Sequence, residues 1–592
     1  MKKRHYKASI LIGFITLCSC TSGLDWNYSD YSSSNSTGST SNGSSSSAGT
    51  SLTGMDDLST YTIEINKTAL EEEENIPASE SDTYYEDYVE NYTPTNTITI
   101  TYNGTSASCS GSVDGVSVAI NGADVTVTST AKNIKYVLSG TTTDGSFKMA
   151  SGDDNKKFEL ELDGVNITNN DGPALNIQVG KRCYIVAKDG TTNTFTDGTS
   201  YTSSTEDQKA TIFSEGELLF SGSGTISVYA NSKAGIVSDD YVFFRPNTNI
   251  YVKSTAGNGI KGNDGLIIKG GVINVETSAA ASKALSSDGY TLIEGGRTTA
   301  ITTGTGAYED NEVSGCAALK SDSLFTMTGG ELNLKSTGSG GKGLSADQEV
   351  NVSGGTIKVI TTGSTYKYGS DDSKAKGIKA DGNLTISGGT VYVRANGGSG
   401  SEGIETKSKL YISGGTTKVY AYDDGINSSS DMYISGGEIF SFGLNNDGLD
   451  SNGNMYISGG TTIAYGTSSP ETGIDVNSES NKVLHITGGI VVGIGGTINS
   501  PSSTSNSQPI VTYSGKISSG SSVSLKSGDS TLLNFEMARD YSSATFMLSA
   551  PGMTSGSSYS LYNGTSLIST LTASYTSSSS IGGGMSGRFG GW

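Results

Sequence analysis

Short runs of alternating hydrophobic and polar residues follow one another along most of this chain. In one such run Leu410 and Ile412 alternate with Tyr411 and Ser413, which predicts a strand with one buried face. A glycine pair follows, and then a second alternating run from Thr417 to Tyr420. The array shows no helical periodicity. The pattern therefore predicts an all-β protein built from short strands and tight turns.

The glycine pair recurs about every 22 to 26 residues where the array is most regular. The first glycine of each pair is Gly270, Gly295, Gly329, Gly354, Gly388, Gly414, Gly436, Gly459 or Gly488. A repeat of this length is too short for a propeller blade and contains no helix. It predicts one coil of a right-handed parallel β-helix, a solenoid. We expect this β-helix, with an N-terminal cap, to span residues 96–496.

Four further segments flank the predicted β-helix. Residues 1–20 begin with basic residues, continue with a short apolar run and end at Cys20, which predicts a bacterial lipoprotein signal with lipidation at Cys20. Residues 21–95 are rich in Ser, Gly and acidic residues and are expected to form a flexible tether. Alternating runs predict a small C-terminal β domain at residues 509–573. The Gly/Ser-rich tail at residues 574–592 is expected to be disordered.

The charge of the chain narrows the range of partners. The sequence has 59 acidic and 38 basic residues, for a net charge of −21. Removal of residues 1–19 takes away four basic residues, so the net charge becomes −25. Such a chain does not suit nucleic acid or an anionic lipid surface. We therefore expect a monomer that contacts the membrane through its lipid anchor only, in the bacterial cell envelope, on the periplasmic or the surface side of the outer membrane.

Acidic residues recur at equivalent positions of successive repeats. Equivalent residues of a parallel coil lie about 4.8 Å apart, so these residues should form columns of mutually repelling carboxylates. Ca²⁺ would offset the repulsion, because it accepts carboxylate, amide and carbonyl oxygens in flexible geometry. The predicted metal ligands are Glu402, Glu405, Asp423, Asp424, Asn427, Asn446, Asp447, Asp450 and Asp475. The alternative is that these residues only form solvated turns.

A second column is aromatic. Tyr411, Tyr433 and Tyr456 hold the same position in three successive repeats, followed by His485. A flat, solvent-facing strip of tyrosines would offer ring faces and hydroxyl groups to a polysaccharide. The alternative is that the tyrosines only stabilise the sheet, as aromatic residues on strand surfaces often do.

Two insertions, Gly304 to Gly315 and Gly363 to Lys376, fall at the same point of their repeats. They should project from one corner of the solenoid. They carry Tyr308, Tyr366 and Tyr368, which we predict to contribute to ligand binding, because long loops on a rigid scaffold often do so. Neutral decoration is the alternative for both insertions.

Three blocks resemble a known family. They are KGIKADGNLTISGGTV at Lys376 to Val391, EGIETKSKLYISGG at Glu402 to Gly415, and DDGINSSSDMYISGG at Asp423 to Gly437. Together they resemble the carbohydrate-binding family of calcium-containing parallel β-helix proteins related in shape to pectate lyases. The resemblance extends over about Thr97 to Thr572. It implies binding of a plant-type glycan, such as cellulose or polygalacturonate, by a β-helix that carries Ca²⁺.

Three function classes remain open on the sequence. The favoured one is a non-catalytic lipoprotein that binds polysaccharide. The second is a calcium-dependent polysaccharide lyase in which a base such as Arg394, or Lys379 beside Glu402 and Glu405, abstracts a proton. The third is a structural surface adhesin. We assign no catalytic residue, because the single histidine left after processing, His485, ends the tyrosine column and does not supply a convincing base.

Overall fold

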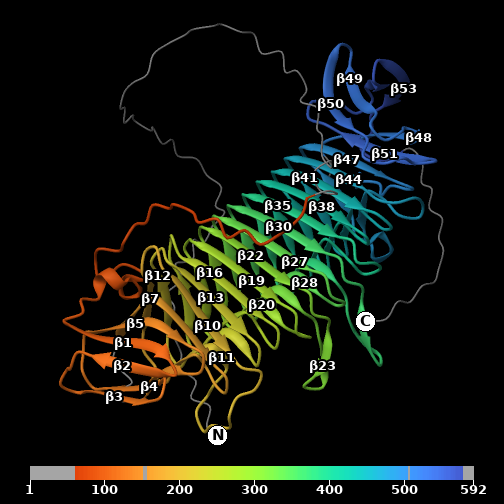
Figure 1. The fold of residues 1–592 in the computed structure, drawn as a ribbon. Coiled ribbons are helices and arrows are strands. Elements are labelled where there is room, and N and C mark those ends of the chain that lie inside the picture. The colour runs from red at the N-terminus through yellow and green to blue at the C-terminus, as the bar shows by residue number, and fades with distance from the viewer. Residues whose placement is uncertain (1–60, 151–156, 504–506, 578–592) are drawn as a thin grey trace, which may run out of the picture. The chain divides into compact units, whose positions relative to one another are not determined.

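The computed structural model describes residues 61–150, 157–503 and 507–577 (Figure 1). These residues form a β-solenoid of about 15 turns with essentially no helix, which confirms the predicted all-β solenoid. Three short 3₁₀ turns occur among them, η1 (Tyr85–Asp87), η2 (Val89–Asn91) and η3 (Ser478–Ser480). None of the described segments is a helix long and apolar enough to cross a membrane.

One side of the solenoid is a sheet of 15 strands within the described residues. All its neighbouring strands are parallel except the first pair. In spatial order they are β3 (Val116–Asn121), β4 (Asp124–Ser129), β6 (Ser146–Ala150), β8 (Leu175–Ile177), β11 (Ala210–Ser214), β14 (Ala234–Ser238), β17 (Ile260–Gly262), β20 (Lys283–Ser287), β25 (Ala317–Ser321), β28 (Lys342–Ala346), β33 (Lys376–Ala380), β36 (Ile404–Thr406), β39 (Ile426–Ser428), β42 (Leu449–Ser451) and β45 (Ile474–Val476).

The other two sides belong to a second, larger sheet that contains two rows of parallel strands. The middle row consists of β9 (Cys183–Ala187), β12 (Leu218–Ser221), β15 (Tyr241–Phe244), β18 (Gly265–Ile268), β21 (Tyr290–Ile293), β26 (Phe325–Met327), β29 (Val350–Val352), β34 (Leu384–Ile386), β37 (Leu410–Ile412), β40 (Met432–Ile434), β43 (Met455–Ile457) and β46 (Leu484–Ile486). The last row consists of β1 (Asn96–Gly104), β5 (Ile134–Thr142), β7 (Phe158–Asn169), β10 (Thr192–Asp197), β13 (Thr225–Ala230), β16 (Asn249–Ser254), β19 (Val272–Thr277), β22 (Arg297–Thr302), β27 (Glu331–Ser336), β30 (Thr356–Thr361), β35 (Thr390–Ala395), β38 (Thr416–Ala421), β41 (Glu438–Gly443), β44 (Thr461–Tyr465) and β47 (Ile490–Gly495).

The glycine pair forms the bend between the middle row and the last row. Between β37 and β38 the second glycine of the pair, Gly415, has φ of +72°, which L-residues with a side chain rarely adopt. A Cβ atom at Gly415 would also lie 2.4 Å from the carbonyl oxygen of Gly389 in the preceding coil. Conformation and space therefore both require glycine, and the repeat in the sequence marks this corner of every regular coil.

The core is a stack of apolar rungs inside the three rows of strands. In one coil Ile404, Leu410, Ile412 and Val419 all point inward and are fully buried. Each of these side chains contributes about 1.5–3 kcal/mol by leaving water. Because the core is narrow and continuous, outward-facing residues of successive coils are held in fixed vertical columns.

Residues 61–95, which we name the N-terminal strap, lie on the solenoid (Figure 1). Arg245 is 3% exposed and forms ion pairs with Glu74 and Glu90, at 2.8 Å and 2.7 Å. Tyr92 of the strap stacks on Tyr184 with ring centroids 5.2 Å apart. The structure thus differs from the expected flexible tether over this part of residues 21–95. The acidic segment has no periodic pattern, and its basic partners lie far away in the sequence.

The C-terminal region continues the solenoid and then leaves it. β48 (Val511–Gly515) and β51 (Ala544–Ser549) pair antiparallel, and β51 also pairs antiparallel with β47. A separate antiparallel sheet contains β49 (Ser522–Ser527), β50 (Ser530–Glu536), β52 (Ser558–Asn563) and β53 (Ser566–Thr572). At the other end, β2 (Ser106–Ser110) pairs antiparallel with β1. The predicted signal at residues 1–20, the lipidation residue Cys20, residues 21–60 and the tail beyond residue 577 lie outside the described residues.

Candidate functional site

One outward-facing position of the 15-stranded sheet forms a continuous column from β17 to β45. Strand register places Lys379 of β33 beside Glu405 of β36, and Asn427 of β39 beside Asp450 of β42. From β17 to β45 the column contains Lys261, Ser286, Lys320, Ser345, Lys379, Glu405, Asn427, Asp450 and Asp475. Its first part is basic and its second part is acidic. Sequence reasoning identified the acidic part and missed the basic part.

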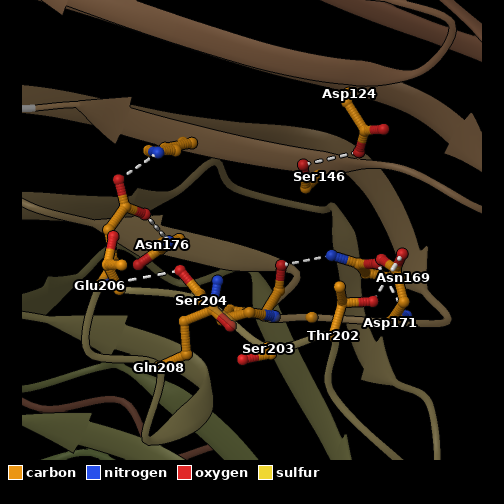
Figure 2. A pocket seen from close by; sticks show the side chains of 14 residues that line it. Asp124, Ser146, Asn169, Asp171, Asn176, Thr202, Ser203, Ser204, Glu206 and Gln208 are labelled. Atoms are coloured by element: carbon orange, nitrogen blue, oxygen red, sulfur yellow. Dashed lines mark hydrogen bonds and ion pairs between the residues drawn. The ribbon is translucent and has the colours of Figure 1, made fainter.

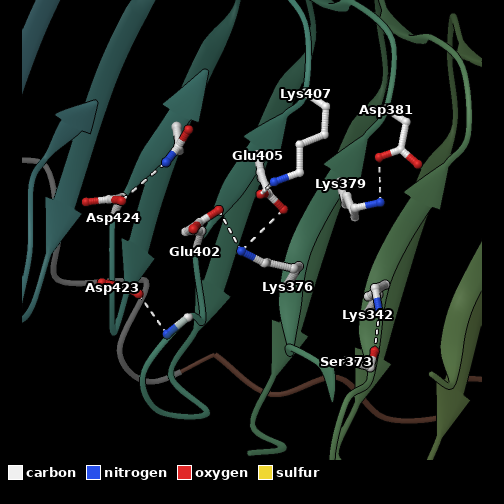
Figure 3. Close-up of polar contacts among 12 residues, drawn as sticks. Lys342, Ser373, Lys376, Lys379, Asp381, Glu402, Glu405, Lys407, Asp423 and Asp424 are labelled. Atoms are coloured by element: carbon white, nitrogen blue, oxygen red, sulfur yellow. Dashed lines mark hydrogen bonds and ion pairs between the residues drawn. The ribbon is translucent and has the colours of Figure 1, made fainter. Parts of the chain in front are cut away.

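Two of the predicted metal ligands have lysine counter-ions. Lys376 Nζ lies 2.7 Å from Glu402 Oε2 and 3.2 Å from Glu405 Oε2, and Lys407 also pairs with Glu405 (Figure 3). Burial raises the pKa of Glu402 to about 7. Burial also opposes ionisation of Glu405, but Lys376 and Lys407 outweigh it and lower the pKa of Glu405 to about 2. The charges of Glu402 and Glu405 are therefore offset within the protein.

The next carboxylates hold backbone groups of neighbouring coils. Asp424 Oδ1 accepts a hydrogen bond from the backbone N–H of Asp447 at 3.0 Å, and Asp447 Oδ1 accepts one from Thr472 at 2.6 Å. Asp423 Oδ2 accepts one from the N–H of Gly400 at 2.7 Å. Asn446 offers its backbone carbonyl to the N–H of Thr467. These acids therefore have a structural role in joining successive coils, in line with the turn alternative.

Asp450 and Asp475 continue the acidic part of the column. Asn427 Nδ2 lies between Asp424 Oδ2 and Asp450 Oδ2, at 3.4 Å and 3.2 Å. Asp475 accepts a hydrogen bond from the side-chain amide of Asn499. The amides thus supply hydrogen bonds to this part of the column, but no positive charge.

We name Asp424, Asp447, Asp450 and Asp475 the acid row. In the part of the chain that the structure describes, no lysine or arginine forms an ion pair with any of them. Burial, and then the charge of Asp475, raise the pKa of Asp447 to about 9 and that of Asp450 to about 7. Burial and then Asp450 also raise the pKa of Asp424. Asp424 and Asp447 are buried, and Asp450 and Asp475 are partly buried. Uncompensated carboxylates of this kind fit a hard divalent cation by donor chemistry and by charge.

A different group of acids forms the tightest carboxylate cluster of the described residues. Oxygens of Asp207, Glu215 and Asp239 all lie within 4.8 Å of one another. Lys209 Nζ contacts Asp207 at 3.1 Å and Asp239 at 2.5 Å, so a lysine already supplies positive charge there. Lys209 therefore offsets one of the three negative charges of this cluster.

The tyrosine column is present on the middle row of strands. Ring centroids of Tyr411 and Tyr433 are 5.1 Å apart, those of Tyr433 and Tyr456 are 5.0 Å apart, and the ring planes differ by 8° and 7°. His485 extends the stack at 4.6 Å from Tyr456. Sequence reasoning placed these residues correctly, because they share one position of the repeat.

The stack is not the flat strip that the sequence suggested. Nearly parallel rings at 5.0 Å must overlap as an offset stack, since side-by-side rings at that distance would collide. Each ring therefore covers part of its neighbour's face. The surface that remains consists of ring edges, partial faces and a row of phenolic hydroxyl groups.

The two insertions are β-hairpins that touch each other. The first contains β23 (Ala307–Glu309) and β24 (Glu312–Ser314), and the second contains β31 (Tyr366–Tyr368) and β32 (Asp371–Ser373). The rings of Tyr308 and Tyr368 stack at 4.1 Å between centroids and are 39% and 52% exposed as residues. Tyr366 packs near Gly306, where a Cβ would lie 2.7 Å from its ring. The prediction that both insertions lie at one corner is confirmed.

A polar cleft of about 350 Å³ lies near the N-terminal end of the 15-stranded sheet (Figure 2). Its side chains include Asp124, Asp171, Asn176 and Glu206. Lys148 Nζ forms an ion pair with Glu206 at 2.5 Å. None of the described residues that line the cleft is aromatic, so these residues offer no stacking surface for a sugar ring.

The two bases considered for a lyase are both engaged elsewhere. Lys379 Nζ forms an ion pair with Asp381 at 2.5 Å (Figure 3). The guanidinium of Arg394 lies over the ring of Tyr61 in the N-terminal strap, 5.2 Å from its centroid. Neither contact favours either residue as a free base.

Comparison with known proteins finds a solved structure and a sequence relative that are similar to parts of this chain. A solved polysaccharide lyase-like protein from C. thermocellum, a gadolinium derivative, aligns with 49% of this chain and 96% of its own chain, at 22% sequence identity and a TM-score of 0.33. A carbohydrate-binding domain-containing protein of Acetivibrio thermocellus is 36% identical over 129 residues. That match covers 21% of this chain and 42% of the relative, so the chain spans less than half of the relative's length.

A family model adds the broadest match. It covers residues 121–420 and 373–444, together more than half of the chain, and includes the lysines of the column, both hairpins and two of the stacked tyrosines. The chain belongs to the family of carbohydrate-binding domain-containing proteins.

Proposed function

We propose that this protein binds a polysaccharide on its solenoid and does not cleave it. The observation that carries the proposal is the offset stack of Tyr411, Tyr433 and Tyr456, which continues with His485. The partial ring faces accept sugar C–H groups, and the phenolic hydroxyls pair with sugar hydroxyls. A plant-type glycan such as cellulose or polygalacturonate is the proposed ligand. The fixed rise of the coil repeats these contacts along a chain-like ligand.

The proposal includes Ca²⁺ at the acid row. Asp424, Asp447, Asp450 and Asp475 would hold the ion, and Asp423 and Asn446 lie close enough in sequence to add oxygens. Support comes from the burial of these carboxylates and from the absence of an ion-pair partner for the acid row among the described residues. When bound, the ion neutralises the row and can bridge it to acidic sugars. Glu402 and Glu405 are less suited to this role because Lys376 already lies between them.

We also propose a location. The sequence of residues 1–20 supports lipidation of Cys20 and attachment of a monomer to the outer membrane of a bacterial envelope. Metabolic labelling with a fatty acid should mark the wild-type protein and leave the Cys20→Ser variant unmarked.

Retention on insoluble cellulose and on polygalacturonate gels tests the proposed function. The Tyr433→Ala variant should lose about tenfold in affinity, because one central ring of the stack is removed. The matched control is Tyr229→Ala, which removes a 37% exposed tyrosine on β13, away from the stack. Equal retention of both variants and the wild type would contradict the proposal. Formation of unsaturated, ultraviolet-absorbing products would show instead that the protein is a polysaccharide lyase.

A further inference from the structure

A second cleft, of about 550 Å³, lies on the basic part of the column. We name it the lysine cleft. Five lysines line it: Lys261, Lys283, Lys320, Lys342 and Lys379. Residues 312–315 of the first hairpin form part of its wall. From β17 to β33 the cleft extends over four coil steps, about 19 Å at roughly 4.8 Å per step. Its length suits a chain-like ligand.

Three of these lysines have carboxylate partners. Lys261 pairs with Asp288 at 2.8 Å, and Lys379 pairs with Asp381 at 2.5 Å. Lys320 pairs with both Asp322 and Asp347. These carboxylates therefore largely offset the positive charges of Lys261, Lys320 and Lys379.

Lys283 and Lys342 differ from these three lysines in their partners, and their own contacts resemble each other. Lys283 Nζ donates to the carbonyl oxygen of Ala281 at 2.6 Å and to Ser314 Oγ at 2.9 Å. Lys342 Nζ donates to the carbonyl oxygen of Gly340 at 3.3 Å and to Ser373 Oγ at 2.6 Å (Figure 3). Each serine ends the second strand of a hairpin. Within the described residues, neither ammonium has a carboxylate within ion-pair distance.

The ammonium groups of Lys283 and Lys342 thus lie in the cleft without a described carboxylate at ion-pair distance, and the acid Glu312 lines the same cleft. Burial, and then the charges of Lys379 and Lys376, lower the pKa of Lys342 to about 8. Burial lowers the pKa of Lys283 as well. A partly buried ammonium costs free energy that an anion beside it would recover.

We propose that the lysine cleft is a glycan subsite in which Lys283 and Lys342 bind acidic groups, carboxylate or sulfate, of a polysaccharide chain. This inference rests on the proposed function and adds a site separate from the tyrosine stack. Direct pairing with lysine needs no metal ion, in contrast to the acid row. The serines at the hairpin ends hold the two ammonium groups in place for the ligand.

Isothermal titration in the presence of EDTA tests the lysine cleft apart from any calcium site. The probes are oligogalacturonate, dextran sulfate, and fully methyl-esterified oligogalacturonate, which has the same sugar backbone without charge. The variants are Lys283→Met/Lys342→Met, Lys342→Arg and, as a control that removes one positive charge outside the cleft, Lys188→Met. Lys188 is half exposed and pairs with Asp163.

The double variant should lose about tenfold or more in affinity for an acidic probe and keep its affinity for the esterified one, because only charge-assisted contacts are removed. Lys342→Arg keeps the positive charge and should therefore retain most of the wild-type affinity, and Lys188→Met should bind like the wild type. Loss for oligogalacturonate alone identifies carboxylate as the bound group, and loss for dextran sulfate alone identifies sulfate.

Two results would overturn the inference. One is equal binding of the acidic probes by the double variant and the wild type. The other is wild-type binding of acidic probes that does not weaken between 50 and 500 mM NaCl, a measurement that needs no variant to fold. A protein that binds esterified but not acidic probes refutes this site alone, whereas a protein that binds no glycan refutes the proposed function as well.

Discussion

Lys379 and Glu405 occupy paired positions on β33 and β36, and at this point the outward column changes from basic to acidic. On one side of the pair lies the lysine cleft, and on the other lies the acid row. A single strand register therefore sets two binding chemistries along the same surface, one that needs no metal ion and one that we propose to need Ca²⁺.

The first prediction concerns Asp450 of the acid row. Asp450→Asn should raise the free energy of unfolding in EDTA at pH 8 by about 1 kcal/mol, because it removes a partly buried carboxylate that has no cationic partner among the described residues. The same change should reduce the stabilisation that Ca²⁺ gives. Thermal unfolding with and without 1 mM CaCl₂ measures both effects. Asp529→Asn, at an exposed turn, should change neither. A variant that is destabilised in EDTA and still fully stabilised by Ca²⁺ would remove Asp450 from the proposed site.

The second prediction is a pH dependence in EDTA. The folded pKa values of Asp447, Asp450 and Asp475 are raised by burial to about 9, 7 and 6, above the value near 4 of an unfolded chain. Between pH 5 and 7 the folded state holds more protons than the unfolded state, so the free energy of unfolding falls as pH rises. Burial lowers the pKa of His485, so this one group makes the free energy of unfolding rise with pH. Its effect is opposite to that of the three acids.

Urea unfolding at intervals of half a pH unit checks this slope. Addition of Ca²⁺ should flatten it, because the ion takes the place of the protons. Stability that rises steadily from pH 5 to 7 in EDTA would show that the acid row does not hold the extra protons.

The third prediction concerns Lys376. Its removal in Lys376→Met leaves Glu402 and Glu405 buried with Lys407 as their remaining counter-ion. We expect a loss of about 3–5 kcal/mol in the free energy of unfolding at pH 7, as for other broken buried ion pairs. Lys188→Met, at an exposed pair, should leave the free energy of unfolding nearly unchanged. Similar effects in the two variants would mean that Glu402 and Glu405 are neutralised by another group.

The fourth prediction concerns the N-terminal strap. Arg245→Met removes two ion pairs and leaves Glu74 and Glu90 without their shared partner, so the strap should detach more readily. Trypsin or GluC should then cleave within residues 61–95 at least about tenfold faster, which corresponds to more than 1.4 kcal/mol of lost local stability. Lys516→Met, at an exposed position, serves as the control. Equal cleavage rates would show that Arg245 does not hold the strap.

The sequence was sufficient for the solenoid and for the position of the aromatic stack. Both follow from the repeat, because inward positions such as Leu410 and corner positions such as Gly415 recur with every coil. A residue at the same place in each repeat, such as Tyr433, is thereby placed beside its equivalents. Its ring orientation was not predictable, since it depends on the packing distance between rings.

Contacts between unlike positions could not be read from the repeat. Arg245 and Glu74 are 171 residues apart, and no pattern joins them. Lys376 was missed as the counter-ion of Glu402 because the two residues belong to different coils. The sequence contains only a weak indication of the lysine cleft. The same position, two residues before the core Leu or Ile of the strand, is a lysine at Lys283, Lys342 and Lys376. The hairpins that complete the cleft have no equivalent in the other coils, so their serines could not be placed.

The route of the N-terminal strap has a mechanical consequence. The hydroxyl of Tyr61 donates a hydrogen bond to the carbonyl of Val359 in β30, and the hydroxyl of Tyr92 donates one to the carbonyl of Ile134 in β5. The strap therefore begins, at Tyr61, on the flank of the solenoid and several coils away from the cap. A force applied to the strap at Tyr61 would therefore act on the ion pairs of Arg245 with Glu74 and Glu90 before it reaches any strand of the N-terminal cap.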